Sequence, residues 1–223
     1  MPIKDIFFDI DDTLFPSSEF AELARRNAVR AMIEMGLGET QEKLHSMLIK
    51  IIAKKGSNYH NHFNDLCAAL KLKKSSRYVA AAIAAYHNTK TSILPYPEIP
   101  RMLLKLKEDG YGIYVATNGD AIKQWDKLIR LGIEHYFEDV FVSEEMGEEK
   151  SPSFFRKVLK QIKAKPEECI MIGDREASDI VPAKRVGIIT IRVRRGKHAK
   201  GKSTALFDVN NLEKLPLIIK KIK

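Results

Sequence analysis

The sequence predicts an α/β fold in which a parallel sheet is flanked by helices and interrupted by an all-helical segment. Two observations lead to this prediction. Short apolar segments rich in β-forming residues alternate with helical patterns of about 10–15 residues. Residues from about 16 to 92, in contrast, show helical patterns only. Strands that alternate with helices form parallel sheets covered on both faces.

Four segments are predicted to be buried strands. Each is short and apolar, and the first three end in acidic or other turn-forming residues. They cover residues 3–8, 112–116, 169–172 and 187–193.

Helices are predicted between these strands from their capping residues. Asp120 is a suitable N-cap for a helix over 121–131, and Gly132 is a suitable stop. Ser151 and Pro152 fit the N-cap and first position of a helix over 153–164, and another helix starts near Pro100. In the helix over 121–131, the residues that recur at helical spacing and predict its packed face are Ile122, Trp125, Leu128 and Ile129.

The helical segment is predicted to be a separate domain inserted after the first strand. Helical patterns cover residues 19–35, 41–54, 59–70 and 77–88. Pro16 bounds the segment on one side, and the sequence 95–97, Pro-Tyr-Pro, bounds it on the other. We therefore expect an α/β core over 1–15 and 93–223, and a helical domain over 16–92.

Composition argues against the disulfide-rich, membrane and secreted classes of protein. Of 223 residues, only two are cysteines, far apart in the chain, and no apolar run approaches the ~20 residues of a membrane span. Acidic residues interrupt the first segment where a signal peptide needs an apolar stretch. We therefore expect a cytoplasmic protein without a membrane partner.

The net charge of +9 is concentrated in one segment, residues 192–202, which holds six basic residues and no acidic one. Without this segment, 32 basic residues face 29 acidic ones. We interpret it as a solvated loop, with a phosphate-attracting or RNA-contacting patch as the alternative. No aromatic residue interrupts it, which disfavours a nucleic-acid partner.

An acidic motif follows the first predicted strand. Asp9 and Asp11, two positions apart, can project to the same side. Two close carboxylates repel unless a cation or a proton intervenes, and Mg²⁺ prefers such oxygen ligands together with phosphate oxygens. One aspartate could attack phosphorus, while the other donates and accepts protons.

Three further polar signals complement this motif. Thr117 and Asn118, at the end of the second strand, can hold phosphoryl oxygens. Asp174 and Asp179 follow the third strand and can join a metal site, and Lys150 precedes a helix start, where anions bind. Each signal alone could be a turn, a helix cap or a solvated side chain. Together they converge on the edge where open α/β sheets bind ligands.

These motifs, in this order, resemble those of the haloacid dehalogenase (HAD) superfamily of aspartate-nucleophile hydrolases. The resemblance spans nearly the whole chain and departs only after Lys150, where the usual first proline is absent. It implies a Rossmann-like core with a C1-type helical cap. The matching residues are Asp9, Asp11, Thr13, Thr117, Lys150, Gly173, Asp174 and Asp179.

The resemblance also implies a role for each residue. Asp9 would be the nucleophile and Asp11 the general acid and base. Thr117, Asn118 and Lys150 would hold the phosphoryl group. The implied Mg²⁺ ligands are the side chains of Asp9 and Asp174 and the backbone carbonyl of Asp11, with Asp179 in support.

The function that we expect is a Mg²⁺-dependent phosphatase that hydrolyses a small phosphorylated metabolite through an aspartyl-phosphate, as a monomer or homodimer. The dehalogenase branch lacks the second aspartate, so Asp11 favours phosphatase chemistry. Residues 117–150 are also similar to a branch that includes glyceraldehyde-3-phosphate phosphatases and 5′-nucleotidases. The alternatives are a phosphomutase, a nucleotide 5′-phosphatase and, outside enzymes, an RNA-associated protein that uses the basic 192–202 loop.

Overall fold

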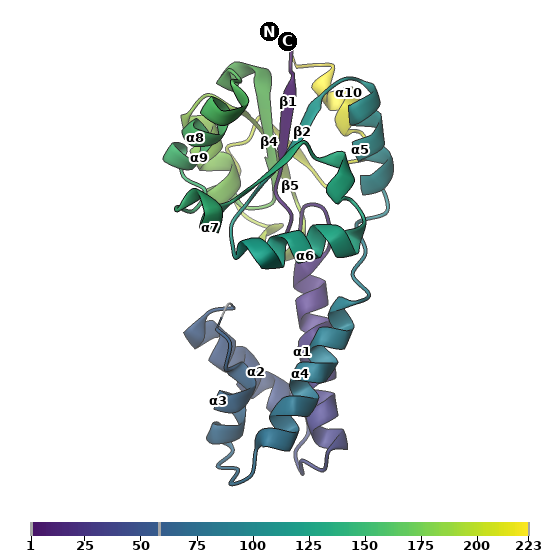
Figure 1. The fold of residues 1–223 in the computed structure, drawn as a ribbon, viewed down its shortest axis with the longest axis vertical. Coiled ribbons are helices and arrows are strands. Elements are labelled where there is room, and N and C mark those ends of the chain that lie inside the picture. Colours follow the sequence, from purple (N-terminus) through teal and green to yellow (C-terminus); the bar gives the residue numbers. More distant parts are fainter. Residues whose placement is uncertain (1, 58, 223) are drawn as a thin grey trace. The chain divides into compact units, whose positions relative to one another are not determined.

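The computed structural model describes residues 2–57 and 59–222, and these form two compact units. One unit comprises residues 2–18 and 94–222, and the other is Glu19–Ile93. Figure 1 shows a sheet with helices in the first unit and helices in the second. In the described part of the chain, no helix is both long and apolar enough to span a bilayer.

The first unit is built on a six-stranded, all-parallel sheet in the order β3-β2-β1-β4-β5-β6. Its strands are β1 (Asp5–Phe8), β2 (Gly112–Thr117), β3 (Asp139–Val142), β4 (Cys169–Gly173), β5 (Ile189–Val193) and β6 (Phe207–Val209). The predicted fold class is confirmed. The two short strands β3 and β6 were not predicted, and β1 and β5 each start two residues later than expected.

Helices cover both faces of this sheet (Figure 1). On one face, Phe154 and Phe155 of α8 pack against Phe7 and Met171 of the central strands. On the other face, α5 packs against β2, and α10 packs against α5. The helices are α5 (Ile99–Glu108), α6 (Ala121–Leu131), α7 (Ser143–Met146), α8 (Pro152–Ile162), α9 (Val181–Arg185) and α10 (Leu215–Ile219).

The predicted caps of α6 and α8 are confirmed. The Asp120 side chain accepts a hydrogen bond from the Lys123 N–H at 3.1 Å, and Ser151 accepts one from the Phe154 N–H at 3.1 Å. Gly132 ends α6 in the left-handed conformation, with φ of 64°.

The predicted packed face of α6 is partly wrong. Leu128 is buried, but Ile122 and Ile129 are 81% and 61% exposed. The inward face of the helix instead includes the polar side chain of Gln124, which is buried. A hydrophobic pattern cannot anticipate a buried glutamine with its own hydrogen-bond partners.

The second unit is helical, as predicted. Its helices are α1 (Ser17–Glu34), which begins in the first unit, α2 (Gln41–Lys55), α3 (His62–Ala69) and α4 (Ser76–Lys90). Its core consists of buried apolar side chains from all four helices, among them Met32, Leu44, Leu66 and Tyr78. These helices are amphipathic, and the apolar faces pack on one another.

The basic segment 192–202 is not simply a solvated loop, since its first residue is buried. Arg192, in β5, is 2% exposed. Its guanidinium donates to the carbonyls of Asp174 at 3.1 Å, His198 at 2.8 Å and Lys202 at 2.5 Å, and pairs with Glu176 at 3.2 Å.

Two further arginines of this segment also have structural partners. Arg194 pairs with Asp208 at 2.7 Å. Arg195 lies over the Tyr96 ring at 3.8 Å from its centroid and pairs with Glu98. Three of the six basic residues are thus engaged within the fold, so the alternative of an RNA-contacting patch gains no support here.

Replacing Arg192 with Met should destabilise the first unit, because three backbone carbonyls lose a buried donor and Glu176 loses its counter-ion. We expect the free energy of unfolding to fall by about 3 kcal/mol in urea titrations. Lys197→Met removes an exposed charge from the same segment and should cost less than about 0.5 kcal/mol. Equal losses in the two variants would contradict the structural role of Arg192.

Candidate active site

Three adjacent strands bring the predicted residues to one edge of the sheet. β1 lies between β2 and β4, with Phe8 in register with Val115 and Ile172. Asp9 follows β1 directly, and its N–H donates to the carbonyl of Ile172 at 2.9 Å. Asp174 follows β4 in the same way. Parallel strands end together, so residues far apart in sequence meet here.

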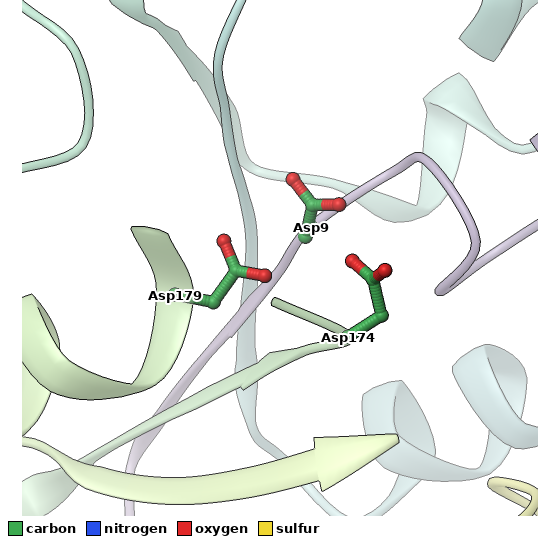
Figure 2. Close-up of side chains that lie close together, drawn as sticks. All are labelled: Asp9, Asp174 and Asp179. Atoms are coloured by element: carbon green, nitrogen blue, oxygen red, sulfur yellow. The ribbon is translucent and has the colours of Figure 1, made fainter. Parts of the chain in front are cut away.

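Asp9, Asp174 and Asp179 form a buried carboxylate cluster. One oxygen from each lies within 4.8 Å of the other two. Figure 2 shows the three carboxyl groups close together at the ends of their elements. Their exposed fractions are 5%, 1% and 0% respectively. Such a cluster needs a proton or cation to offset the repulsion between its charges.

Asp179 reaches the cluster from a single π-helical turn, Glu176–Ile180. Its Oδ2 accepts a hydrogen bond from the Arg175 N–H at 2.9 Å, which closes the turn back on the end of β4. The carboxyl group lies directly over Gly173, where any side chain would overlap it. This contact explains the glycine that precedes Asp174 in the motif.

Lys150 is buried between two of these carboxylates. Its Nζ lies 2.5 Å from Asp9 Oδ1 and 2.5 Å from Asp179 Oδ1. The Lys150 N–H donates to Asn118 Oδ1 at 2.7 Å, which fixes the backbone from which the side chain extends. The lysine therefore reaches Asp9 although the proline that usually follows it is absent.

Burial governs the protonation of the cluster. It raises the pKa of the Asp9 carboxyl to about 7, against the opposing charge of Lys150. Burial also raises the pKa of Asp174 to about 8, and the charges of Asp9 and Asp179 add to the shift. Burial would lower the pKa of Lys150, but Asp179 and Asp9 outweigh it, so the pKa lies above its ordinary value. Lys150 is thus positively charged at neutral pH.

The donor set fits a hard divalent cation. Lys150 offers one positive charge to three carboxylates, which leaves negative charge uncompensated when all three are ionised. Asp174 Oδ1 is buried and, among the described residues, has no hydrogen-bond partner. Carboxylate oxygens with an unfilled coordination direction are the ligands that Mg²⁺ binds.

A pocket opens beside the cluster. Thr117, at the end of β2, is 1% exposed, and the Asn118 side chain keeps two N–H donors besides the oxygen bound to Lys150. The pocket lining brings together most of the predicted site and two residues, Arg175 and Ser178, that were not predicted. Its lining residues are Asp9, Asp11, Thr117, Asn118, Lys150, Arg175 and Ser178.

The Asp11 carboxylate lies at this pocket but is not one of the three clustered carboxylates. Both of its oxygens lie 2.7 Å from the Nζ of Lys127 in α6. Sequence analysis did not single out Lys127. It lies 116 residues from Asp11 on an otherwise ordinary helix, so no local signal marks it.

Comparison with known proteins shows which family the chain resembles in sequence. The family model described as haloacid dehalogenase-like hydrolase matches residues 3–187. The chain is 45% identical to the glyceraldehyde 3-phosphate phosphatase of Methanocaldococcus jannaschii over 99% of both chains.

Two solved structures are similar over almost their whole length. A HAD phosphatase from Thermococcus onnurineus aligns with a TM-score of 0.71 and 21% identity, covering 97% of this chain and 98% of that one. The HAD-type hydrolase YfnB from Bacillus subtilis, bound to magnesium, aligns with a TM-score of 0.69 and 20% identity, covering 98% and 99%. These two structures support the fold.

The raised pKa values of Asp9 and Asp174 predict that Mg²⁺ binding depends on pH. Because a metal needs ionised ligands, it must displace protons below the pKa values of about 7 and about 8. Isothermal titration calorimetry should show affinity at least about tenfold higher at pH 8 than at pH 6. Titrations in buffers with different ionisation enthalpies should show proton release at pH 6.

Asp174→Asn provides the control, because it removes one ligand charge and should abolish most of the Mg²⁺ binding at both pH values. Affinity that is independent of pH, with no proton release, would contradict the buried carboxylate site.

Proposed function

The chain belongs to the haloacid dehalogenase-like hydrolase family and is a phosphatase of that family, and from this premise we propose that it is a Mg²⁺-dependent phosphomonoesterase with Asp9 as nucleophile. The observation that carries the proposal is the buried convergence of Asp9 with Asp174, Asp179 and Lys150. The substrate is a small phosphorylated metabolite. Glyceraldehyde 3-phosphate is the first to test, since a 45% identical relative is named for that activity.

In the first step, an Asp9 carboxylate oxygen attacks phosphorus, and the bond from phosphorus to the substrate oxygen breaks. Asp11 gives its proton to that departing oxygen, which leaves as an alcohol. In the second step, water attacks phosphorus and gives a proton to Asp11, while the bond from Asp9 to phosphorus breaks. Inorganic phosphate is released, and both aspartates return to their starting states.

The proposed Mg²⁺ ligands are the Asp9 and Asp174 side chains and the Asp11 backbone carbonyl, with Asp179 in a supporting position. The buried Asp174 Oδ1, for which the described part of the chain provides no hydrogen-bond partner, supports this assignment. When bound, Mg²⁺ supplies positive charge to the phosphoryl oxygens and lets Asp9 stay ionised at neutral pH. Asp179 also holds Lys150 at 2.5 Å, which keeps the ammonium beside the nucleophile.

Three groups are proposed to hold the phosphoryl oxygens that do not react. The Lys150 ammonium, 2.5 Å from Asp9 Oδ1, lies where negative charge accumulates during transfer. The Thr117 hydroxyl and the Asn118 amide line the same pocket at the end of β2. We further propose that residues 16–92 act as a cap that excludes water while phosphoryl transfer proceeds.

Asp9→Asn should abolish phosphate release from glyceraldehyde 3-phosphate, because an amide cannot serve as the nucleophile. We expect a loss of at least roughly 10³-fold in kcat, measured by inorganic phosphate release in the presence of Mg²⁺. Asp5→Asn, a matched change at the start of the same strand β1 and away from the cluster, should retain activity.

Full activity of Asp9→Asn would overturn the proposal. If the wild-type protein instead moved the phosphoryl group within a sugar phosphate and released no phosphate, the phosphomutase alternative would hold. If it released phosphate from nucleoside monophosphates far faster than from the triose, the 5′-nucleotidase alternative would hold.

A further inference from the structure

A lysine outside the recognised motifs forms an ion pair with the side chain of Asp11. The Nζ of Lys127, in α6, lies 2.7 Å from both carboxylate oxygens of Asp11. The same Nζ lies 5.9 Å from the centroid of the Phe15 ring, on the loop that carries Asp11. The Asp11 carboxylate thus has a two-point contact on one side.

Lys127 is itself held by a buried neighbour one helical turn earlier. Gln124 Oε1 accepts a hydrogen bond from Lys127 Nζ at 3.2 Å, and Gln124 Nε2 donates to the carbonyl of Asn118 at 3.1 Å. Gln124 is 5% exposed and packs so closely on Gly119 that a Cβ there would lie 2.5 Å from Nε2. A chain of hydrogen bonds therefore links the loop after β2, which carries Asn118, to Asp11.

Stability alone does not account for this arrangement. The Lys127 and Asp11 side chains are 24% and 40% exposed, and ion pairs with that much exposure add little to folding free energy. What the contact does is restrict the Asp11 side chain, which is 40% exposed although its neighbours Ile10 and Asp12 are buried, and which otherwise has several rotamers open to it. A proton donor is effective only when it is held within reach of the atom that receives the proton.

We propose that Lys127 is a positioning residue that orients the Asp11 carboxyl group for proton transfer, with Gln124 fixing Lys127. This inference rests on the proposed function, in which Asp11 protonates the departing oxygen while the bond from that oxygen to phosphorus breaks. Lys127 touches neither substrate nor metal and exchanges no proton in this scheme.

Two substrates whose leaving groups differ in their need for a proton test this role. An alkyl phosphate such as glyceraldehyde 3-phosphate needs a proton on its departing oxygen, whereas 4-nitrophenolate leaves without one. In Lys127→Met, kcat/KM for glyceraldehyde 3-phosphate should fall by about 10²-fold, and kcat/KM for 4-nitrophenyl phosphate by less than about tenfold. Lys127→Arg, which keeps a cation that can bind both oxygens, should stay within about tenfold of the wild type on both substrates.

Two controls separate positioning from other effects. Lys123→Met removes a half-exposed lysine from the same helix, whose Nζ lies 3.7 Å from Asp120 Oδ2, and kcat/KM for both substrates should stay unchanged. In an Asp11→Asn background, Lys127→Met should cause no further loss on the alkyl substrate, because the group that it positions is gone.

Two results would overturn the inference. One is an equal loss of kcat/KM on both substrates in Lys127→Met, and the other is a full additional loss when Lys127→Met is added to Asp11→Asn. Lys127 would then act directly on the substrate or on the fold. Those results would not contradict the proposed phosphatase function as long as Asp9→Asn remained inactive. Activity in Asp9→Asn would instead remove the proposed function.

Discussion

The candidate active site depends on three buried carboxylates held close together, two of which contact the Lys150 ammonium. In water such groups would separate, and in a protein interior their repulsion is offset only by protons or by opposite charge. Lys150 offsets part of it, and burial raises the pKa values of Asp9 and Asp174, so that protons or a metal offset the rest. The uncompensated negative charge that destabilises the three carboxylates favours the binding of a divalent cation.

The surrounding fold holds this cluster in place from several directions. Gly173 leaves room for the Asp179 carboxyl group, and Asn118 Oδ1 accepts a hydrogen bond from the Lys150 backbone N–H. Arg192, on the neighbouring strand β5, donates to the backbone carbonyl of Asp174. Arg192, the first basic residue of segment 192–202, thus supports the site through its contact with Asp174. Catalytic geometry of this kind needs such a supporting layer, because small displacements cost much activity.

The sequence predicted the sheet core, and it predicted most of the residues that the structure brings together at the candidate site, because buried parallel strands are apolar runs and the polar residues follow them directly. It missed β3 and β6, which have four and three residues and too little pattern to separate from loops. It also misjudged Arg192 as part of a solvated loop and the outward face of α6 as packed. The errors about Arg192 and α6 share a cause: partners such as the Asp174 carbonyl for Arg192 and the Asn118 carbonyl for Gln124 lie outside the element concerned, and periodicity carries no information about them.

The central claim, that Asp9 and Asp174 converge on one metal, is tested most directly by crystals of the full chain grown with Mn²⁺ in place of Mg²⁺. An anomalous difference map identifies the ion independently of the rest of the electron density. The account predicts a peak within about 2.5 Å of a carboxylate oxygen of both Asp9 and Asp174. A peak elsewhere, with Lys150 alone still bridging Asp9 and Asp179 at saturating Mn²⁺, would contradict it.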